Sequence, residues 1–261
     1  MCFAYDATPP DLPPGITEHG GAASGEDVTL TAADGVQFSA YVARPEAPNG
    51  AGIVILPDVR GLFRFYQELA VRFAVAGVSA IAIDYFGRTA GISPRDESFE
   101  YMPHVQQVQT SQVAQDVRAA ITYLQQHTMP APWALFTVGF CFGGFMSYLQ
   151  DVDQPDLAGA IAFYGIPNRE RAGSPAVMDL VSQFKAPLLA FFGGQDQAIA
   201  PDAVEAFGKA LTEAHVQHEI VVYPDAPHSF FDRHMEQFQA DSANAWERTL
   251  AFIGQHTPRK P

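Results

Sequence analysis

Short apolar runs alternate with segments of helical periodicity along most of the chain. Each apolar run is typical of a buried parallel strand, and the runs cover residues 52–56, 78–83, 133–138, 158–163, 187–192 and 219–223. In the intervening segments and near the C-terminus, apolar residues recur at helical spacing; these segments are residues 66–76, 106–126, 145–150, 201–214 and 242–253. This alternation predicts an α/β fold, with a mostly parallel sheet, helices on both of its faces and right-handed crossovers.

The N-terminal part of the chain follows other patterns. Residues 28–30 and 36–42 alternate around Asp34-Gly35, which predicts an antiparallel β-hairpin. Residues 1–25 are rich in Pro and Gly and lack periodicity, so we expect an arm that lies on the surface or is disordered. No composition break divides the remainder. We therefore expect one domain over residues 26–255, followed by a tail at 256–261.

Two connections are long, residues 84–105 and 165–184. Both follow the C-terminal ends of predicted strands, where α/β folds place their sites. Long loops in compact domains are often binding loops or lids, so these two are candidates for contact with substrate.

Composition narrows the range of partners. The formal net charge of −14 argues against a nucleic-acid partner, because phosphate binding needs clustered Lys and Arg. An anionic small molecule remains compatible with this charge, since one or two local arginines make a positive pocket. No apolar run reaches about 18 residues, so no membrane-spanning helix is expected. No Cys/His cluster has zinc spacing and no Gly-x-Gly-x-x-Gly follows the first buried strand, so we expect neither a metal nor a cofactor.

The chain has two cysteines, Cys2 and Cys141. Two cysteines in 261 residues do not suggest a disulfide scaffold, and Cys2 in a mobile N-terminus is not expected to pair with Cys141. The first six residues show neither the basic nor the apolar region of a signal peptide. These observations predict a cytoplasmic protein whose thiols stay reduced.

The segment around Cys141 is the most informative motif. Gly139-Phe140-Cys141-Phe142-Gly143 lies between an apolar run and a helix-like run, which matches the Cys form of the nucleophile elbow. The turn holds its central residue at positive φ and needs small residues two positions before and after it. At the start of a helix, the dipole and the unpaired N–H groups favour the thiolate. The alternative is a small buried cysteine beside packing glycines.

A thiol nucleophile needs a base and a group that orients the base. Asp196 follows a strand and two glycines, and His228 follows the next strand, in the chain order nucleophile, acid, histidine. His228 is thus predicted to be the general base and Asp196 to fix its tautomer. The alternative acids are Asp202 and Asp225. The other histidines fit less well: His215 and His218 lie at a helix-to-strand junction, His256 lies in the tail, and His104 lies in a long loop where it could touch substrate.

Two backbone N–H groups are expected to form the oxyanion hole. One belongs to Phe142, directly after the nucleophile, and the other to Val59, in the loop after the first buried strand. Asp58 in that loop would stand close enough to the thiol to affect its ionisation. The alternatives for Asp58 are a helix N-cap or a solvated loop acid.

With these residues placed, the chain resembles the dienelactone hydrolase (carboxymethylenebutenolidase) family. The resemblance runs from about residue 27 to residue 253 and rests on four segments, 56–62, 83–88, 138–144 and 227–230. It implies an α/β-hydrolase fold and a triad of Cys141, His228 and Asp196 without a cofactor. The cysteine is the specific feature, because most α/β-hydrolases have serine at the elbow.

The resemblance also implies substrate-binding residues. The family has an acidic residue, usually Glu, that pairs with the resting thiol, and Asp58 matches it. A family arginine that binds the substrate carboxylate matches Arg88. A second substrate arginine lies four residues after the histidine; here that position is Asp232, Arg233 comes next, and Arg60 is another candidate.

Three functions fit these observations. The first is a hydrolase that opens a lactone or cleaves a small ester through a thioester acyl-enzyme. The second is a ligand-binding protein on the same fold with weak turnover or none. In the third, Cys141 is a redox-responsive thiol. The protein is expected to be a monomer or a small homo-oligomer that acts on an ester or lactone, either neutral or anionic.

Overall fold

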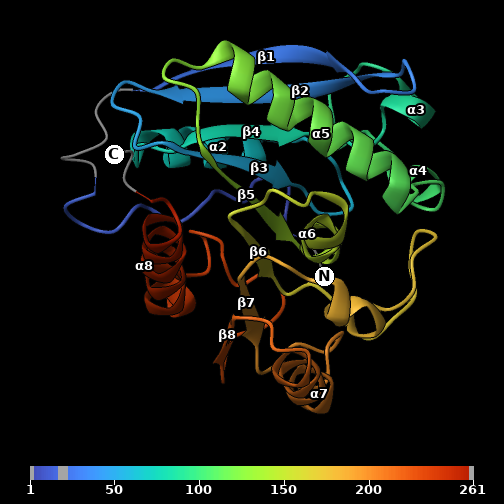
Figure 1. Ribbon diagram of the computed structural model, residues 1–261, viewed down its shortest axis with the longest axis vertical. Helices are drawn as coiled ribbons and strands as arrows, with labels where there is room; N and C mark the ends of the chain where they lie inside the picture. The colour runs from blue at the N-terminus through green and yellow to red at the C-terminus, as the bar shows by residue number, and fades with distance from the viewer. Residues whose placement is uncertain (1–2, 17–22, 259–261) are drawn as a thin grey trace.

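Eight strands form a single sheet in the computed structural model, which describes residues 3–16 and 23–258 (Figure 1). The strands are β1 Ala23–Thr31, β2 Gln37–Pro45, β3 Ala51–Leu56, β4 Ser79–Ile83, β5 Ala134–Phe140, β6 Gly159–Phe163, β7 Leu188–Gly193 and β8 His218–Tyr223. Their order across the sheet is β1-β2-β4-β3-β5-β6-β7-β8. β1 pairs antiparallel with β2 and β2 antiparallel with β4, and all other pairs are parallel. The predicted hairpin and the predicted parallel sheet are both confirmed.

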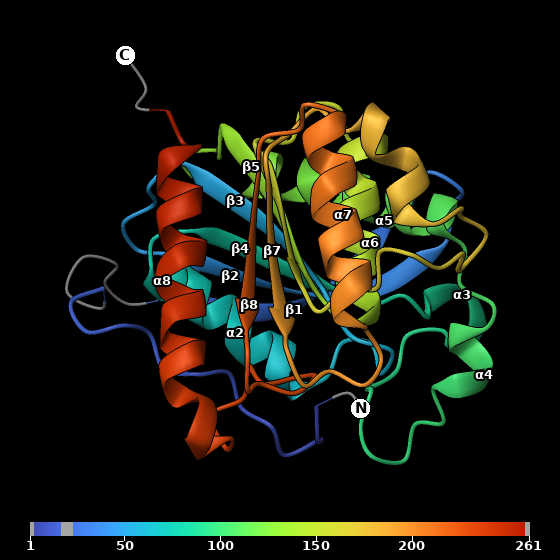
Figure 2. The ribbon, with the colours of Figure 1, turned by 90° about the horizontal axis from the view of Figure 1, so that it is seen from below.

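Among the described residues, five long helices cover the sheet on both faces, as the sequence pattern predicts. Helices α2 (Arg64–Val75) and α8 (Gln239–Gln255) lie on one face, and α5 (Thr110–His127), α6 (Phe142–Asp153) and α7 (Pro201–Glu213) lie on the other (Figure 2). β3 and β5, at the centre, are buried along their whole length, which explains why their sequences are uniformly apolar. No helix among the described residues is long and apolar enough to cross a membrane.

Several helix boundaries depart from the sequence prediction by a few residues, and two of these departures have a local reason. Helix α6 begins at Phe142 instead of residue 145, because Gly143 and Gly144 provide no apolar side chain to reveal the periodicity. Helix α5 begins at Thr110 instead of residue 106, because a separate short helix, α4 (Met102–Val105), ends just before it.

The two long connections carry short elements of their own. Helix α3 (Gly87–Ala90) and α4 lie between β4 and α5, and a 3-10 helix, η1 (Val177–Gln183), lies between β6 and β7. A second 3-10 helix, η2 (Glu236–Phe238), precedes α8. Within the tail, the described part contacts the body, since the indole Nε1 of Trp133 donates to the carbonyl of Pro258 at 2.8 Å.

The N-terminal arm packs more closely than predicted. Phe3 is only 2% exposed, and its ring stacks on Phe65 of α2 at 4.1 Å between centroids. The carbonyl of Pro10 accepts hydrogen bonds from Arg72 and from the indole of Trp246, at 2.9 and 3.1 Å. Residues 3–16 therefore lie against α2 and α8, and residues 23–25 belong to β1. Residues 1–2 and 17–22 lie outside the described residues, and so does the prediction about Cys2.

Candidate active site

Cys141 occupies a strained turn between β5 and α6. Its φ and ψ are 56° and −110°, and it is half-buried. Its N–H donates to the carbonyl of Phe163 at 3.0 Å, and its own carbonyl accepts the N–H of Phe145 at 3.1 Å, the first hydrogen bond of α6. The predicted positive φ at the strand-to-helix turn is confirmed.

The glycines on either side of Cys141 are required by close backbone approaches. A Cβ atom at Gly139 would overlap the carbonyl oxygen of Gly143, and a Cβ atom at Gly143 would overlap the carbonyl oxygens of Leu56 and Pro57. Because Gly143 has no side chain, the start of α6 can approach the loop that follows β3. The structure confirms the prediction that both positions need glycine.

Asp196 and His228 form a hydrogen-bonded pair at the same edge of the sheet. Nδ1 of His228 lies 2.6 Å from Oδ2 of Asp196, and the Oδ1 atom of Asp196 accepts the N–H of Ala198 at 2.8 Å. Asp196 follows β7 and His228 follows β8, and the two exit loops are joined because the N–H of Gln195 donates to the carbonyl of Ala226 at 2.9 Å. Their side chains are 0% and 7% exposed, so water competes little for this pair.

The alternative acids have other positions. Asp202 lies in the first turn of α7, where its Oδ1 accepts the N–H of Ala203 at 2.9 Å. Asp225 is exposed. The structure therefore pairs His228 with Asp196, the acid that follows the strand end and its glycines.

Strained backbone surrounds this edge. Besides Cys141, Tyr164 after β6 and Ser229 beside His228 have positive φ angles of 42° and 60°. The ring of Tyr164 lies 4.8 Å from the His228 ring and 6.3 Å from that of Phe140. Tyr164 thus contacts both Phe140, the last residue of β5 before Cys141, and the histidine. Non-glycine residues at positive φ cost free energy and cluster at functional sites.

Asp58 is fully buried and is neither a helix cap nor a solvated acid. The N-cap of α2 is Phe63, while Oδ1 of Asp58 accepts the N–H of Arg60 at 2.8 Å within its own loop. Oδ2 is buried without a hydrogen-bond partner among the described residues. Burial raises the pKa of Asp58 to about 6, although the amide and guanidinium of Arg60, the hydroxyl of Tyr66 and the amide of Phe3 act in the opposite direction.

Tyr85, which follows β4, contacts the loop after β3 that contains Asp58. It is buried, and its hydroxyl donates to the carbonyl of Pro57 at 2.9 Å. Burial raises its pKa well above the usual range, and the charges of Asp58, Asp84 and Cys141 act in the same direction. Tyr85 is therefore a neutral hydrogen-bond donor near both the thiol and Asp58.

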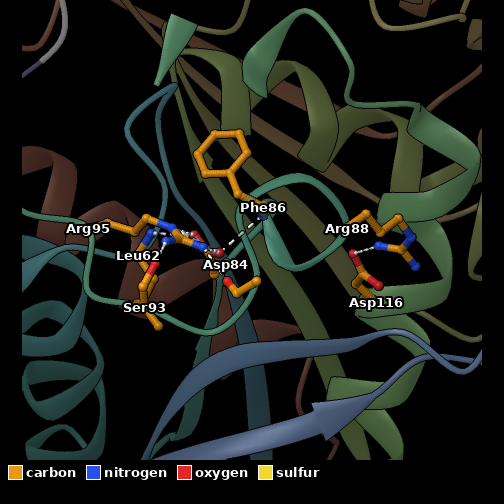
Figure 3. Close-up of polar contacts among 8 residues, drawn as sticks. Leu62, Asp84, Phe86, Arg88, Ser93, Arg95 and Asp116 are labelled. Atoms are coloured by element: carbon orange, nitrogen blue, oxygen red, sulfur yellow. Dashed lines mark hydrogen bonds and ion pairs between the residues drawn. The ribbon is translucent and has the colours of Figure 1, made fainter. Parts of the chain in front are cut away.

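The arginine predicted to bind substrate is paired with carboxylates of the protein. Nη1 of Arg88 lies 2.7 Å from Asp116 on α5 (Figure 3). Nε of Arg88 lies 2.9 Å from Asp34 in the hairpin turn. The side chain is only 10% exposed. This geometry gives no support to a substrate contact by Arg88.

The two other candidate arginines contact the N-terminal arm. The guanidinium of Arg233 lies 3.3 Å from Asp11, and that of Arg60 lies 4.9 Å from the centre of the Tyr5 ring. Asp232, at the position of the second family arginine, accepts the N–H of Thr8 at 3.2 Å. Residue 232 is thus an aspartate that binds the N-terminal arm, where the family pattern has an arginine that binds substrate.

Two further arginines near this edge were not predicted from the sequence. Arg95, in the loop after α3, makes a buried ion pair with Asp84 at the end of β4; Nη2 and Oδ2 are 2.9 Å apart (Figure 3). Asp84 also accepts the N–H of Leu62, so it joins this loop to the loop after β3. Arg171, in the long connection after β6, lies over the ring of Phe142 at 4.5 Å. The only sequence signal for Arg171 is its location in a long connection at a strand end.

The described residues contain no group of three or more His, Cys, Asp or Glu side chains that could hold a metal ion. At this edge of the sheet, the described residues offer a thiol, an imidazole–carboxylate pair and backbone N–H groups.

Comparisons with known proteins identify the family of this chain. The dienelactone hydrolase family profile matches residues 38–257. A Salmonella typhimurium protein provisionally named carboxymethylenebutenolidase is 31% identical, over 99% of this chain and 97% of its own. A Bradyrhizobium protein provisionally named 2-oxo-3-(5-oxofuran-2-ylidene)propanoate lactonase is 28% identical, over 83% of this chain and 89% of its own.

Solved structures show the same fold. A crystal structure provisionally described as a dienelactone hydrolase from Klebsiella pneumoniae superposes with a TM-score of 0.80 at 26% identity, covering 90% of this chain and all of that one. A dienelactone hydrolase-like phosphotriesterase from metagenomic libraries has a TM-score of 0.75 at 19% identity, which bears on the fold alone; it covers 91% of this chain and all of that one. These matches indicate a hydrolase of esters or lactones, and the chain belongs to the dienelactone hydrolase family.

Proposed function

We propose that this protein hydrolyses a lactone or a small carboxylic ester through a thioester formed on Cys141. The observation that carries the proposal is the Asp196–His228 pair, 2.6 Å apart, on the sheet edge where Cys141 occupies the elbow. A carboxylate on Nδ1 keeps the proton on that nitrogen and leaves Nε2 to accept the thiol proton.

Acylation then follows from the residues at the elbow. Nε2 of His228 takes the proton of Cys141, and the thiolate sulfur attacks the substrate carbonyl carbon. The carbonyl π electrons move to oxygen and give a tetrahedral oxyanion. When the oxyanion collapses, the carbon–oxygen bond to the leaving group breaks, and His228 returns its proton to the departing oxygen. With a lactone, the departing oxygen stays attached to the acyl group.

Deacylation uses the same groups in reverse. His228 removes a proton from water, whose oxygen attacks the thioester carbon. When the tetrahedral oxyanion collapses, the carbon–sulfur bond breaks, His228 gives its proton to the departing sulfur, Cys141 is restored as a thiol, and a carboxylic acid leaves the site. Asp196 stabilises the imidazolium in both halves without taking its proton.

The N–H groups of Phe142 and Val59 are suited to bind the oxyanion. Within the described parts of the chain, neither N–H group donates a hydrogen bond. Their segments lie together because Gly143 lets α6 approach the loop after β3. Loss of one oxyanion donor typically costs about 2.7–4 kcal/mol of transition-state stabilisation.

Asp58 fits the position of the acidic residue that pairs with the resting thiol in this family. Its buried Oδ2 lacks a protein partner among the described residues. A thiol–carboxylate contact would hold the resting cysteine protonated until substrate binds. A thiol nucleophile also suits a reducing compartment, so we place the enzyme in the cytoplasm.

The test is hydrolysis of dienelactone, followed by ultraviolet absorbance, beside a simple aryl ester. Mass spectrometry of the quenched aryl ester reaction should show the acyl adduct on the peptide that contains Cys141, and hydroxylamine should remove it. Cys141→Ala should abolish turnover and adduct, whereas Cys2→Ala should retain both. Turnover that survives in Cys141→Ala would overturn the proposal.

A further inference from the structure

Two buried tyrosines hold the two polar atoms of a single peptide group, the one between Pro57 and Asp58. The hydroxyl of Tyr85 donates to the carbonyl of Pro57 at 2.9 Å. The N–H of Asp58 donates to the hydroxyl of Tyr66, in the first turn of α2, at 2.8 Å. Because a peptide group is planar, hydrogen bonds at both of its polar atoms fix the orientation of the whole plane.

The next peptide group, between Asp58 and Val59, carries one of the two proposed oxyanion donors. Its carbonyl accepts the N–H of Gly61 at 3.1 Å, which closes a tight turn. In a trans peptide the N–H points opposite to the carbonyl, so the N–H of Val59 is directed away from Gly61. The turn requires glycine, because Gly61 has a φ of 79° and a Cβ atom there would overlap the carboxylate of Asp84.

From residue 58 to residue 63, Val59 has the one backbone N–H group that finds no partner in the described parts of the chain. The N–H groups of residue 58 and residues 60–63 all donate hydrogen bonds within the protein. The loop after β3 therefore has one donor left for a ligand, and the surrounding hydrogen bonds fix its direction.

Tyr85 also contacts the residue that carries the other proposed oxyanion donor. Its ring meets the ring of Phe142 edge to face, at 5.5 Å between centroids and an interplanar angle of 87°. The carbonyl of Pro57, which accepts the Tyr85 hydroxyl, is also one of the groups that a Cβ atom at Gly143 would overlap. Tyr85 thus contacts both segments that provide the oxyanion donors, the loop after β3 and the start of α6.

We infer that Tyr85 and Tyr66 are positioning residues, which orient the N–H of Val59 toward the oxyanion of the tetrahedral intermediate. This inference rests on the proposed hydrolysis at Cys141. The oxyanion differs from the carbonyl oxygen of the substrate in both charge and position. A donor that loses its orientation therefore weakens transition-state binding, while binding of the substrate itself changes little.

The experiment measures single-turnover acylation by an aryl ester, which separates binding from chemistry. Tyr85→Phe and Tyr66→Phe each remove one hydroxyl and keep the ring. Each should lower the acylation rate at saturating ester by about 10- to 100-fold and leave the half-saturating concentration within about threefold of wild type.

Tyr148→Phe is the matched control. Tyr148, on α6, is also a buried tyrosine, but its hydroxyl has no hydrogen-bond partner among the described residues. Its removal should leave both the acylation rate and the half-saturating concentration within about twofold of wild type.

Two further measurements separate positioning from damage to the thiol. A trifluoromethyl ketone forms a tetrahedral adduct with a thiol, so it should bind Tyr85→Phe and Tyr66→Phe about 10- to 100-fold more weakly than wild type. Alkylation by iodoacetamide forms no oxyanion. Followed on the peptide that contains Cys141, it should proceed within about twofold of the wild-type rate in both variants.

An acylation loss in Tyr85→Phe and Tyr66→Phe no larger than in Tyr148→Phe would overturn the inference while the proposed hydrolysis stands. So would an equal loss in acylation and in alkylation of Cys141, since the effect would then lie on the thiol. If wild-type protein hydrolyses neither the aryl ester nor dienelactone, the proposed function fails, and the inference fails with it.

Discussion

Asp196 and His228 are 32 residues apart in the chain, yet Oδ2 of the acid lies 2.6 Å from Nδ1 of the imidazole. Parallel β7 and β8 are neighbours in the sheet, so their C-terminal ends bring the two residues together. The N–H of Ala198 holds the second carboxylate oxygen. The carboxylate is thus fixed from both sides, and its negative charge faces the histidine.

Asp196→Asn tests the role of that charge. The amide cannot stabilise an imidazolium and can present its NH₂ group to Nδ1, which favours the wrong tautomer. We expect kcat/KM for a lactone or ester to fall by about 10²- to 10⁴-fold. Asp225→Asn, at an exposed position three residues before His228, should stay within about twofold of wild type. A larger loss in Asp225→Asn than in Asp196→Asn would reassign the acid of the triad.

Because the Arg95–Asp84 ion pair is buried, we expect removal of its cation to destabilise the protein strongly. Arg95→Met would leave the fully buried carboxylate of Asp84 without its cation, at a cost of roughly 3–5 kcal/mol. For a chain of this length that corresponds to a Tm lowered by roughly 5–9 °C, measurable by calorimetry.

Two variants separate charge from packing at this site. Adding Asp84→Asn to Arg95→Met should recover part of the stability, because no unpaired charge remains. Arg64→Met, which breaks an exposed pair with Glu68, should cost less than about 1 kcal/mol. Equal losses in Arg95→Met and Arg64→Met would contradict the importance of the buried pair.

The strands, the loops at their ends and the elbow could be predicted because each has a local sequence pattern. Buried parallel strands are uniformly apolar, so their runs stand out, and the loops at their ends must lie on one edge. That reasoning identified Asp196 and His228 without a contact map. The glycines at 139 and 143 revealed the elbow because a tight turn excludes side chains there.

Contacts between side chains far apart in the sequence could not be predicted in the same way. Asp34 and Asp116 lie 54 and 28 residues from Arg88, and only the packing of α5 beside the hairpin brings them to its guanidinium. No local pattern distinguishes an arginine that pairs internally from one that meets substrate. Likewise, a Pro- and Gly-rich composition indicates that the arm lacks periodic structure but does not show that Phe3 is buried.

Asp58 should make stability depend on pH with a definite sign. Its pKa is raised from 3.8 to about 6 in the folded protein, so the folded state binds the proton more tightly than the unfolded state. The free energy of unfolding therefore falls as pH rises from about 4 to about 6. Asp58→Asn removes this loss and should be increasingly more stable than wild type, by at most about 3 kcal/mol at pH 7.

Urea unfolding at pH 4, 5.5 and 7 would measure the difference. Asp96 serves as a control of opposite sign, because hydrogen bonds from Ser98 lower its pKa. Its contribution is present above its unfolded pKa and lost as pH falls, so Asp96→Asn should gain nothing at pH 7. A pH-independent difference between wild type and Asp58→Asn would show that the carboxyl titrates normally in the folded state.

The burial of Phe3 predicts that the N-terminal arm stabilises the domain. Its ring lies 4.1 Å from Phe65 and 6.0 Å from Phe140, one residue before Cys141. Phe3→Ala removes a fully packed ring and should cost about 3–5 kcal/mol, a Tm lowered by roughly 5–9 °C. Asp11→Asn, which breaks only exposed pairs with Arg72 and Arg233, should cost less than about 1 kcal/mol. If instead both variants melt with wild type, the arm rests on the surface without contributing to the core, as its composition alone predicts.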